Sequence, residues 1–461
     1  MCGVFGIRAP GRDVARVTHF ALHALQHRGQ ESAGIAVSDR GRLTVLRDMG
    51  LVTQVFSEQK LQGLRGDLAI GHTRYSTTGS TKWANAQPIV QHGRARTIAL
   101  GHNGNLTNAS ELRGGLAAEG IRLSSTSDTE LIAALIAHDL APLEEAVANA
   151  MRRLEGAYSV TALSEGQLVA FRDPHGFRPL CLGRLEDDWV AASETCALDL
   201  LGAEHDREVG RGEVVVFGED GPRGLQAVEA PEQGALCIFE FFYLARPDTR
   251  LEGVEVHAAR LRMGERLARE APVDADLVLP IPDSGTPAAI GFSRVSGIPF
   301  SEGLIKNRYV GRTFIQPDQG LRQQGIKMKY NPLAEVAGQR VVAVDDSIVR
   351  GNTTRQIVAM LFEAGAAEVH LRISSPPIVG PCFYGIDLAD EDELIAAART
   401  VEQVREHIGA TTLAYLSLEG LQESTQRPET QLCRACLTRD YPTRVPRELK
   451  TEKLRFEPAR A

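Results

Sequence analysis

The sequence predicts a chain of two domains: a layered α+β domain with helices on two stacked sheets (αββα), followed by an α/β domain on a parallel sheet. Three observations support this prediction. The length of 461 residues exceeds what a single hydrophobic core usually organises. The first half is rich in short strand-like runs between glycine turns, with a few helical segments among them. The second half repeats an apolar run, a polar loop and a helical pattern, which is typical of a parallel sheet.

The change of rhythm falls near residues 230–255, after a turn-rich stretch at 219–234. We therefore expect a first domain at 2–235, a second domain at 236–442, and a charged, proline-bearing tail at 443–461. The expected strands of the first half lie at 3–7, 32–38, 42–48, 67–77, 97–104, 158–163, 167–173, 188–194 and 212–218, and the expected helices at 17–26, 128–139 and 143–154.

Composition excludes several classes of protein. Hydrophobic content of 43% and charged content of 24% are those of an ordinary globular protein. The net charge of −8 argues against a nucleic-acid partner. No run approaches the ~18 apolar residues of a membrane span, and no signal peptide opens the chain, so we expect a cytoplasmic protein without a membrane partner. In that reducing compartment the seven cysteines are expected to serve as nucleophile, metal ligands or core residues.

The chain opens with "MCGVFGI", which places a cysteine at position 2. We expect Met1 to be removed, so that Cys2 carries a thiol and a free α-amine on one residue. Because an α-amine has a reference pKa near 8, its neutral form can act as the base for the thiol. The alternative is that Cys2 is a small buried residue that opens the first strand.

Polar loops after two apolar runs supply the other groups that a thiol attacking an amide needs. In "GHNGNLTN", Asn103 and Gly104 combine a side-chain amide with a backbone N–H, which suits an oxyanion hole. In "GHTRYSTTG", Arg74 suits the α-carboxylate of a substrate, and in "STSDTE", Asp128 suits its α-ammonium. The alternatives are a turn cap for Asn103, a surface ion pair for Arg74 and a cap of the helix at 129–139 for Asp128.

These motifs, together with "LQHRGQESAGI" at 25–35, resemble the glutaminase domain of class II glutamine amidotransferases over residues 2–230. The resemblance implies an N-terminal-nucleophile hydrolase fold. It also implies that Cys2 forms a glutamyl thioester, that Arg74 and Asp128 bind glutamine, and that Asn103 and Gly104 form the oxyanion hole.

A second site is predicted in "VVAVDDSIVRGNTTRQI" at 341–357, which reads as a strand, a loop and the start of a helix. Backbone N–H groups and hydroxyls at a helix N-terminus make an anion site, here over Arg350, Gly351, Asn352, Thr353 and Thr354. The spacing is not that of a Walker loop. Asp345 and Asp346 suit sugar hydroxyls and a hard cation. The alternative is a Rossmann-like turn with a capping acid.

This run resembles the phosphoribosylpyrophosphate (PRPP) signature of type I phosphoribosyltransferases. The resemblance implies that Ser347 also contacts PRPP and that Ser284, in "PIPDSGTPAA", joins Asp345 and Asp346 around Mg²⁺. The basic, glycine-bearing stretch 303–332 reads as a lid that orders over PRPP. Its expected phosphate contacts are Lys306, Arg312, Lys327 and Lys329, and the alternative is an exposed, solvated loop.

In this order the two halves resemble the glutamine phosphoribosylpyrophosphate amidotransferases over nearly the whole chain. The resemblance implies that ammonia released at Cys2 is channelled to C1 of PRPP, giving 5-phosphoribosylamine, glutamate and pyrophosphate in the first committed step of purine synthesis. It further implies a homo-oligomer, dimer or tetramer, inhibited by purine nucleotides. A hexosamine-forming or asparagine-forming amidotransferase and a PRPP-sensing regulator are the alternatives. The run at 341–357 disfavours the first two, and the lack of a basic element disfavours the third.

Four further cysteines raise the question of a metal site. Cys433 and Cys436 have C-x-x-C spacing, and Cys237 and Cys382 lie far away in sequence. Spacing alone leaves open a structural Zn²⁺ site, an iron–sulfur cluster, or core packing of Cys237 and Cys382. The resemblance favours a 4Fe-4S cluster, which one branch of the family carries on cysteines in these contexts. Members of that branch often have a short propeptide before the nucleophile, whereas here Met1 alone precedes it. The remaining cysteines, Cys181 and Cys196, are expected in the core.

Overall fold

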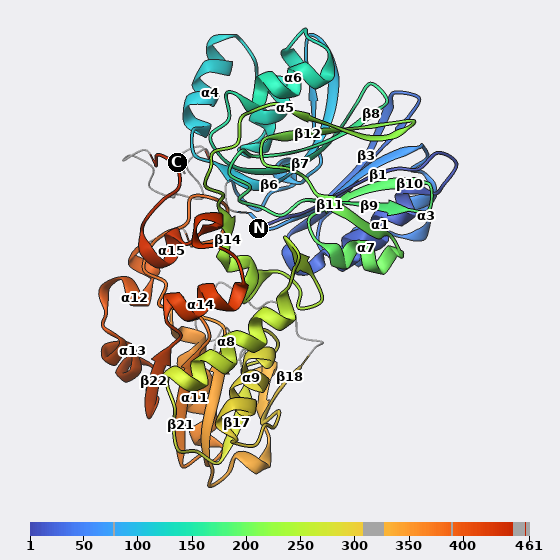
Figure 1. Cartoon of the computed structure of the whole chain (residues 1–461). Helices are drawn as coiled ribbons and strands as arrows, with labels where there is room; N and C mark the ends of the chain where they lie inside the picture. Colours follow the sequence, from blue (N-terminus) through green and yellow to red (C-terminus); the bar gives the residue numbers. More distant parts are fainter. Residues whose placement is uncertain (77–78, 308–326, 389–390, 446–456, 458–461) are drawn as a thin grey trace.

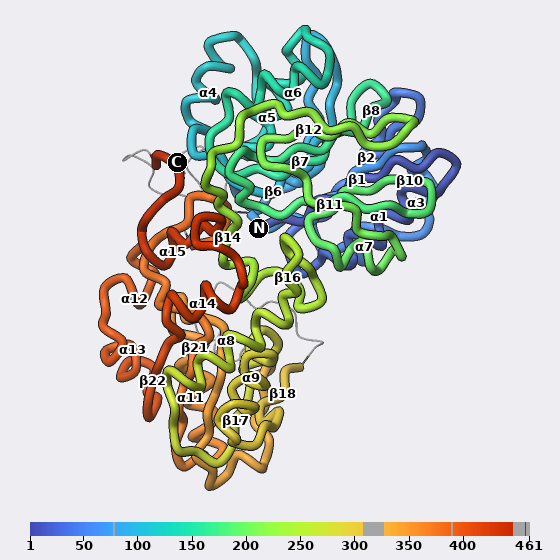
Figure 2. The backbone as a smooth tube through the Cα atoms, viewed as in Figure 1, coloured from blue at the N-terminus to red at the C-terminus, as the bar shows by residue number. Residues whose placement is uncertain are grey.

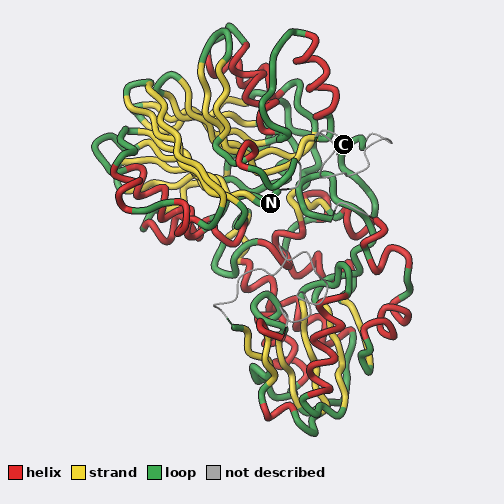
Figure 3. The backbone as a smooth tube through the Cα atoms, turned by 180° about the vertical axis from the view of Figure 1, so that it is seen from behind, coloured by secondary structure: helices red, strands yellow, loops and turns green. Residues whose placement is uncertain are grey.

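The structure is a computed structural model that describes residues 1–76, 79–307, 327–388, 391–445 and 457. Figure 1 shows two lobes: the first half of the chain (blue to green) forms one, and most of the second half (yellow to orange) forms the other. Seen from behind, the strands of the upper lobe gather at its centre with helices outside them (Figure 3). Among the described residues, none of the helices combines the length and apolar character that a membrane span requires.

A seven-stranded antiparallel sheet carries the start of the chain at its centre, in the order β11-β9-β10-β1-β4-β2-β3. Successive residues of β1 face opposite sides of this sheet, as the strand period requires. Val4 therefore lies in the core between the two sheets, whereas Phe5 and Ile7 lie in the core beneath the helices. The strands are β1 (Gly3–Arg8), β2 (Ser32–Asp39), β3 (Arg42–Met49), β4 (Leu68–Arg74), β9 (Cys181–Leu185), β10 (Asp188–Ala192) and β11 (Glu204–Glu208).

A six-stranded antiparallel sheet, in the order β13-β12-β8-β7-β6-β5, stacks on the first through the inter-sheet core. Its strands are β5 (Ile89–His92), β6 (Thr97–Leu106), β7 (Gly156–Ser164), β8 (Gln167–Arg172), β12 (Glu213–Gly218) and β13 (Gly221–Gln226). The turn-rich stretch at 219–234 thus contains a strand that the sequence did not predict. Its side chains are mostly exposed, so its sequence lacks the apolar pattern of a buried strand. The strand forms by pairing with β12 at the edge of the sheet.

Helices cover the outer face of each sheet, which confirms the predicted αββα layers. The first sheet is covered by α1 (Val14–Ala24), α2 (Val52–Val55), α3 (Glu58–Gln62) and α7 (Thr195–Leu201). The second is covered by α4 (Ala109–Ala118), α5 (Thr129–His138) and α6 (Leu143–Met151).

The other lobe is built on a four-stranded parallel sheet in the order β17-β20-β21-β22, as predicted. Alternate residues of β20 enter two cores: Val342 and Val344 pack toward α8, α9 and α14, and Val341 and Ala343 pack toward α11 and α13. The strands are β17 (Leu277–Pro280), β20 (Arg340–Asp345), β21 (Glu368–Ile373) and β22 (Thr412–Tyr415). The helices are α8 (Val256–Glu270), α9 (Thr286–Ser296), α11 (Asn352–Glu363), α12 (Ile395–Ala398), α13 (Val401–Ile408) and α14 (Leu418–Thr425).

The segment around β23 (Leu432–Cys433) and α15 (Ala435–Thr438) returns to the junction between the lobes (Figure 2). There β14 (Leu236–Cys237) pairs in parallel with β23 (Leu432–Cys433), and the π-helix η3 (Glu240–Leu244) follows β14. The remaining short elements are β15 (Arg250–Leu251), β16 (Val254–Glu255), β18 (Leu304–Lys306), β19 (Tyr330–Pro332) and α15 (Ala435–Thr438). Two distant parts of the sequence are therefore held together where one lobe meets the other.

Candidate active sites

Cys2 lies buried directly before β1, at the centre of the first sheet. Its thiol donates to the Tyr75 carbonyl (3.5 Å), its nitrogen donates to Asn103 Oδ1 (3.2 Å), and its carbonyl accepts from Arg28 Nε (2.9 Å). Burial raises the pKa of the thiol, and the positive charge of the adjacent N-terminal amine opposes this rise. Every polar atom of the Cys2 backbone and side chain is thus held by a residue distant in sequence.

Met1 is present in this structure, so the Cys2 nitrogen is a peptide nitrogen here. The Met1 amine is itself buried, and burial lowers its pKa to about 5, with the neighbouring Arg178 and Arg28 acting in the same direction. An amine at this end of the chain is therefore held mainly in its neutral, basic form at pH 7.

The predicted oxyanion pair lies on β6 beside Cys2. Asn103 Nδ2 is buried and has no hydrogen-bond partner among the described residues, although Oδ1 of the same amide is engaged by Cys2. A buried donor without an acceptor is costly unless a ligand supplies one. Gly104 has φ +154°, and a Cβ there would lie 1.9 Å from the Ala157 carbonyl, so only glycine fits at this position.

Arg74 and Asp128, the expected contacts of glutamine, are both buried. Arg74 ends β4 and donates to the Ser80 carbonyl (3.2 Å), and burial lowers its pKa, so it is not a surface ion pair. Asp128 occupies the N-cap position of α5, but its side chain makes no capping bond there. Its Oδ2 instead accepts from the Leu106 nitrogen (3.0 Å), which sets the carboxylate against the end of β6.

Two acidic residues that the sequence did not single out support the loop after Arg74. Glu31 accepts from the Ser76 nitrogen (3.1 Å) and the Ser76 hydroxyl (2.9 Å). Glu457, in the tail, accepts from the Ser80 nitrogen (3.0 Å) and from three side chains. Those side-chain donors are Ser80 Oγ (2.5 Å), Thr126 Oγ1 (2.6 Å) and Lys82 Nζ (2.8 Å). No sequence motif indicates which residues these two carboxylates bind, so their partners are known only from the fold.

The acidic pair of the second site lies where β20 ends and its loop begins. Ser284 Oγ and Ser347 Oγ each donate to Asp346 (2.5 Å), and the Asp346 nitrogen donates to Asp345 Oδ1 (2.9 Å). Burial raises the pKa of both carboxyls, and the charge of Asp346 adds to the effect on Asp345. A buried and a half-buried carboxyl that repel each other beside two hydroxyls suit a bound divalent cation.

The loop reaches α11 through Gly351, which has φ +77°. Asn352, Thr353 and Thr354 then form the first turn of α11, with their N–H groups at the positive end of the helix dipole. The expected anion cradle is therefore present as a backbone arrangement.

The predicted lid cations do not converge on this loop. Lys306 pairs with Asp283, the residue before Ser284, and Lys329 lies 5.2 Å from the ring centre of Tyr330. Arg350, which belongs to the loop itself, pairs with Glu393. Lys327 pairs with Glu363 (3.0 Å) at the far end of α11, about 16 Å from its first turn at 1.5 Å per residue. Arg312 lies outside the described residues.

Comparison with known proteins decides the family. A glutamine amidotransferase domain family matches residues 72–200. The amidophosphoribosyltransferase of Mycobacterium tuberculosis is 52% identical over 461 residues, covering 97% of this chain and 87% of the relative. That of Synechococcus elongatus is 52% identical over 464 residues, covering 99% of this chain and 94% of the relative. The chain belongs to the amidophosphoribosyltransferases.

A solved structure agrees with this assignment to the amidophosphoribosyltransferases. Glutamine PRPP amidotransferase from B. subtilis, complexed with ADP and GMP, matches with a TM-score of 0.91 at 45% identity. The match covers 97% of this chain and 98% of that one. The family and the fold inferred from the sequence motifs are therefore confirmed.

The amidophosphoribosyltransferase chain gathers four cysteines beside the junction. Cys237 and Cys433 are opposite each other in the β14–β23 ladder, and the Cys436 carbonyl accepts from the Val379 nitrogen (2.9 Å) shortly before Cys382. None of the four forms a disulfide. Cys382 Sγ accepts two backbone N–H groups, from Tyr384 and Ile386, both at 3.4 Å. Such bonds suit a sulfur that carries negative charge, as a metal-bound thiolate does.

No group of three or more His, Cys, Asp or Glu side chains in the described part of the chain is arranged to hold a metal ion. Cys181 and Cys196 lie in the core beneath the helices, as expected.

The site geometry predicts a specific effect of removing the unpartnered amide. Asn103→Ala should lower kcat for glutamine hydrolysis about 10²–10³-fold, because one donor to the developing oxyanion is lost. Steady-state glutaminase assays measure this effect. Asn108→Ala is the matched control, since Asn108 is also buried but bonds to Arg153 and Glu155 away from Cys2. An equal loss in both variants would contradict the assignment.

Proposed function

We propose that this chain hydrolyses glutamine at Cys2 and transfers the released ammonia to C1 of PRPP at the loop that begins with Asp345. The products are 5-phosphoribosylamine, glutamate and pyrophosphate. The observation that carries the proposal is the buried Asn103 amide, whose Oδ1 holds the Cys2 nitrogen while its Nδ2 has no partner among the described residues. This observation supports a thiol that attacks the carboxamide carbon of glutamine and an amide that donates to the oxygen of the same carbonyl group.

At the first site, removal of Met1 frees the Cys2 amine to take the proton of its own thiol. The thiolate attacks the carboxamide carbon of glutamine, and the charged oxygen is stabilised by Asn103 Nδ2 and the Gly104 N–H. The C–N bond then breaks, the amine returns the proton to the leaving ammonia, and a thioester remains for water to hydrolyse. Arg74 and Asp128 hold the α-carboxylate and the α-ammonium of glutamine.

At the second site, the backbone N–H groups and hydroxyls of the loop and of the first turn of α11 bind the phosphate of PRPP. These residues are Ser347, Arg350, Gly351, Asn352, Thr353 and Thr354. Asp345, Asp346 and Ser284 fit Mg²⁺, which when bound supplies positive charge to the leaving pyrophosphate. The stretch 303–332 acts as a lid over PRPP, with Lys306, Arg312, Lys327 and Lys329 as its phosphate contacts, and its closure excludes water that competes with ammonia.

We propose further properties of this chain that concern its domains, its regulation, its location and its oligomeric state. The domains divide at 235/236, where the first lobe passes into β14, and 443–461 forms a tail. Purine nucleotides inhibit the enzyme, and the complex of the B. subtilis relative with ADP and GMP supports the binding of such nucleotides. The enzyme is a cytoplasmic homo-oligomer, either a dimer or a tetramer.

A separate proposal concerns four cysteines that we assign as ligands of a 4Fe-4S cluster: Cys237, Cys382, Cys433 and Cys436. Each cysteine of such a cluster binds a different iron, so the four sulfurs stand farther apart than the ligands of a single zinc. The burial of Cys237, Cys433 and Cys436, the absence of disulfides among the four cysteines and the N–H bonds to Cys382 support this choice. When bound, the cluster ties the segment at 433–436 to the junction at Cys237.

The nucleophile is tested by Cys2→Ala. Glutamine-dependent synthesis of phosphoribosylamine should be abolished, whereas synthesis from free ammonia should persist because the second site is untouched. Both are measured as pyrophosphate release from PRPP. Cys181→Ala is the control, because Cys181 is also buried in the core beneath this sheet and its thiol bonds to the Ala192 carbonyl, away from Cys2. Equal loss with both nitrogen donors would refute the two-site scheme, and an active enzyme that retains Met1 would refute the amine as base.

The acidic pair is tested by the double change Asp345→Asn and Asp346→Asn. PRPP binding should be lost, because neutral amides do not hold the cation that PRPP brings, while basal glutaminase activity remains. Calorimetric titration with PRPP and Mg²⁺ measures the first effect, and glutamate release measures the second. Unchanged PRPP affinity would refute the assignment.

The cluster is tested by purification without oxygen. We expect a brown protein with about four irons per chain, following the composition of the cluster. Exposure to oxygen should bleach the colour and lead to unfolding, because the junction loses its cross-link. Iron analysis and circular dichroism follow the two events. A colourless, fully active protein that contains zinc or no metal would rule the cluster out.

A further inference from the structure

Four charged side chains that are fully buried join the nucleophile to the lobe junction. The side chains of Arg28, Glu194, Glu240 and Arg178 are each 0% exposed. Arg28 holds the Cys2 carbonyl through Nε (2.9 Å), and its two terminal nitrogens donate to Glu240 at 3.0 and 2.8 Å. The two positive and two negative charges balance, so removing any one leaves an uncompensated charge in a dry interior.

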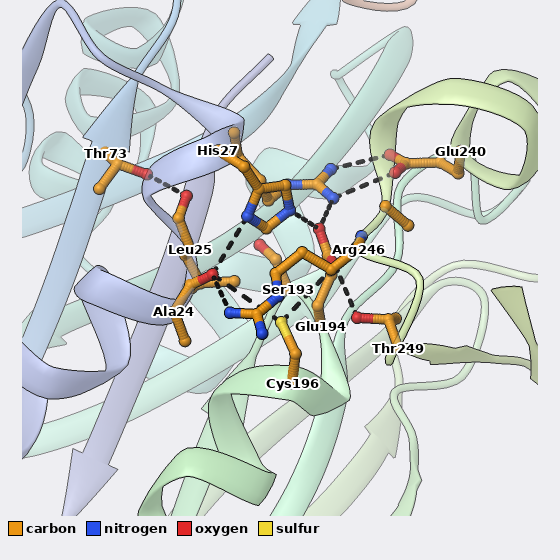
Figure 4. Close-up of polar contacts among 12 residues, drawn as sticks. Ala24, Leu25, His27, Thr73, Ser193, Glu194, Cys196, Glu240, Arg246 and Thr249 are labelled. Atoms are coloured by element: carbon orange, nitrogen blue, oxygen red, sulfur yellow. Dashed lines mark hydrogen bonds and ion pairs between the residues drawn. The ribbon is translucent and has the colours of Figure 1, made fainter. Parts of the chain in front are cut away.

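Glu194, one of the four buried side chains, is bound by residues of both lobes (Figure 4). His27 Nε2 lies 2.7 Å from its carboxylate, the Thr249 hydroxyl donates to it at 2.7 Å, and the Arg246 nitrogen donates at 2.9 Å. Arg28 also pairs with it. His27 and Arg28 keep the pKa of Glu194 well below its usual range, although burial acts against them. The carboxylate is therefore fixed by both lobes at once.

Arg178 continues the group toward the cysteines. Its Nη1 lies 3.4 Å from Glu240 Oε1, while Nε and Nη2 donate to the Tyr384 carbonyl at 3.0 and 2.5 Å. The nitrogen of the same Tyr384 donates to Cys382 Sγ (3.4 Å). An unbroken series of contacts thus runs from the Cys382 sulfur through Tyr384, Arg178, Glu240 and Arg28 to the carbonyl of Cys2.

We propose that Glu240 and Arg178 are positioning residues for the glutaminase reaction, and that they carry the state of the four-cysteine site to the backbone of Cys2. This inference rests on the proposed roles of Cys2 and of the cysteines. Neither residue has a contact with Arg74 or Asp128, which are assigned to glutamine. They act through Arg28 on the placement of the thiol, and a nucleophile displaced by about 1 Å loses about 10²-fold in rate.

Arg172 offers a matched control within the same turn. It is also almost fully buried, and it donates to the carbonyls of Arg178, Gly176 and Val209 and to Glu252. Its bond to the Arg178 carbonyl supports the backbone of that residue, but among the described contacts Arg172 has none of its own with Glu240, Arg28 or Cys2. Loss of Arg172 therefore reports what a damaged turn does to the enzyme, separately from what the buried chain of charges does.

The first experiment compares Glu240→Gln, Arg178→Met and Arg172→Met in the full-length enzyme. Glu240→Gln and Arg178→Met should lower kcat for glutamine hydrolysis about tenfold or more, with KM for glutamine changed less than about twofold. Synthesis from ammonia should persist. Arg178→Lys should restore part of kcat, because it keeps the charge. A fall in kcat in Arg172→Met as large as in Arg178→Met, or a loss expressed in KM, would overturn the inference.

The second experiment uses a readout other than turnover. A diazoketone analogue of glutamine alkylates the reactive thiol, and visible circular dichroism records the iron–sulfur chromophore before and after. Alkylation of Cys2 should change the spectrum of the parent enzyme and leave that of Glu240→Gln unchanged. An unchanged parent spectrum in an alkylated, iron-loaded enzyme would refute the link alone. Failure of Cys2 to react would refute the nucleophile, and absence of iron would refute the cluster together with the link to it.

Discussion

The buried position of Cys2, directly before the central strand β1, is the constraint on which most of the architecture depends. The residues that follow Cys2 are committed to β1 and cannot also surround its thiol. Every group around Cys2 therefore comes from a distant segment: Arg28 follows α1, Tyr75 follows β4, and Asn103 lies on β6. The central position of β1, paired on both edges by β10 and β4, holds the start of the chain rigidly enough for these groups to meet it.

Burial of the start of the chain brings charges into the interior, and they determine how the lobes are joined. A buried guanidinium is tolerated only when carboxylates surround it, because the desolvation cost of an unpaired ion is several kcal/mol. Arg28 is paired with Glu194 from the first lobe and with Glu240 from the π-helix at the start of the second. The junction is thus an electrostatic unit as well as an apolar one. The parallel pairing of β14 with β23 brings the segment Leu432–Cys433 to the same junction.

Strand pairing explains why some site residues were predictable as a set and others were not. β17 and β20 are adjacent and parallel, so the loops at their carboxyl ends meet, and Ser284 reaches Asp346. Motifs that end a strand therefore predict proximity as well as chemistry. Lys306 and Lys327 carry long flexible side chains on either side of residues 308–326, and each forms an ion pair with a local carboxylate. No pattern in the sequence specifies which anion such a cation selects.

The sequence alone determined the order of the layers and the family, and it predicted Cys2 as the nucleophile and Asp345 and Asp346 as the acidic pair. These depend on short-range patterns: alternation along strands, glycine at Gly104 and Gly351, and polar loops after apolar runs. Only the tertiary structure revealed Glu194, Glu240, Arg178 and Glu457. The physical reason is that an isolated Glu or Arg in a sequence is indistinguishable from a solvated surface residue. Its burial, and hence its need for a partner, exists only after segments as distant as Arg28 and Glu240 have come together.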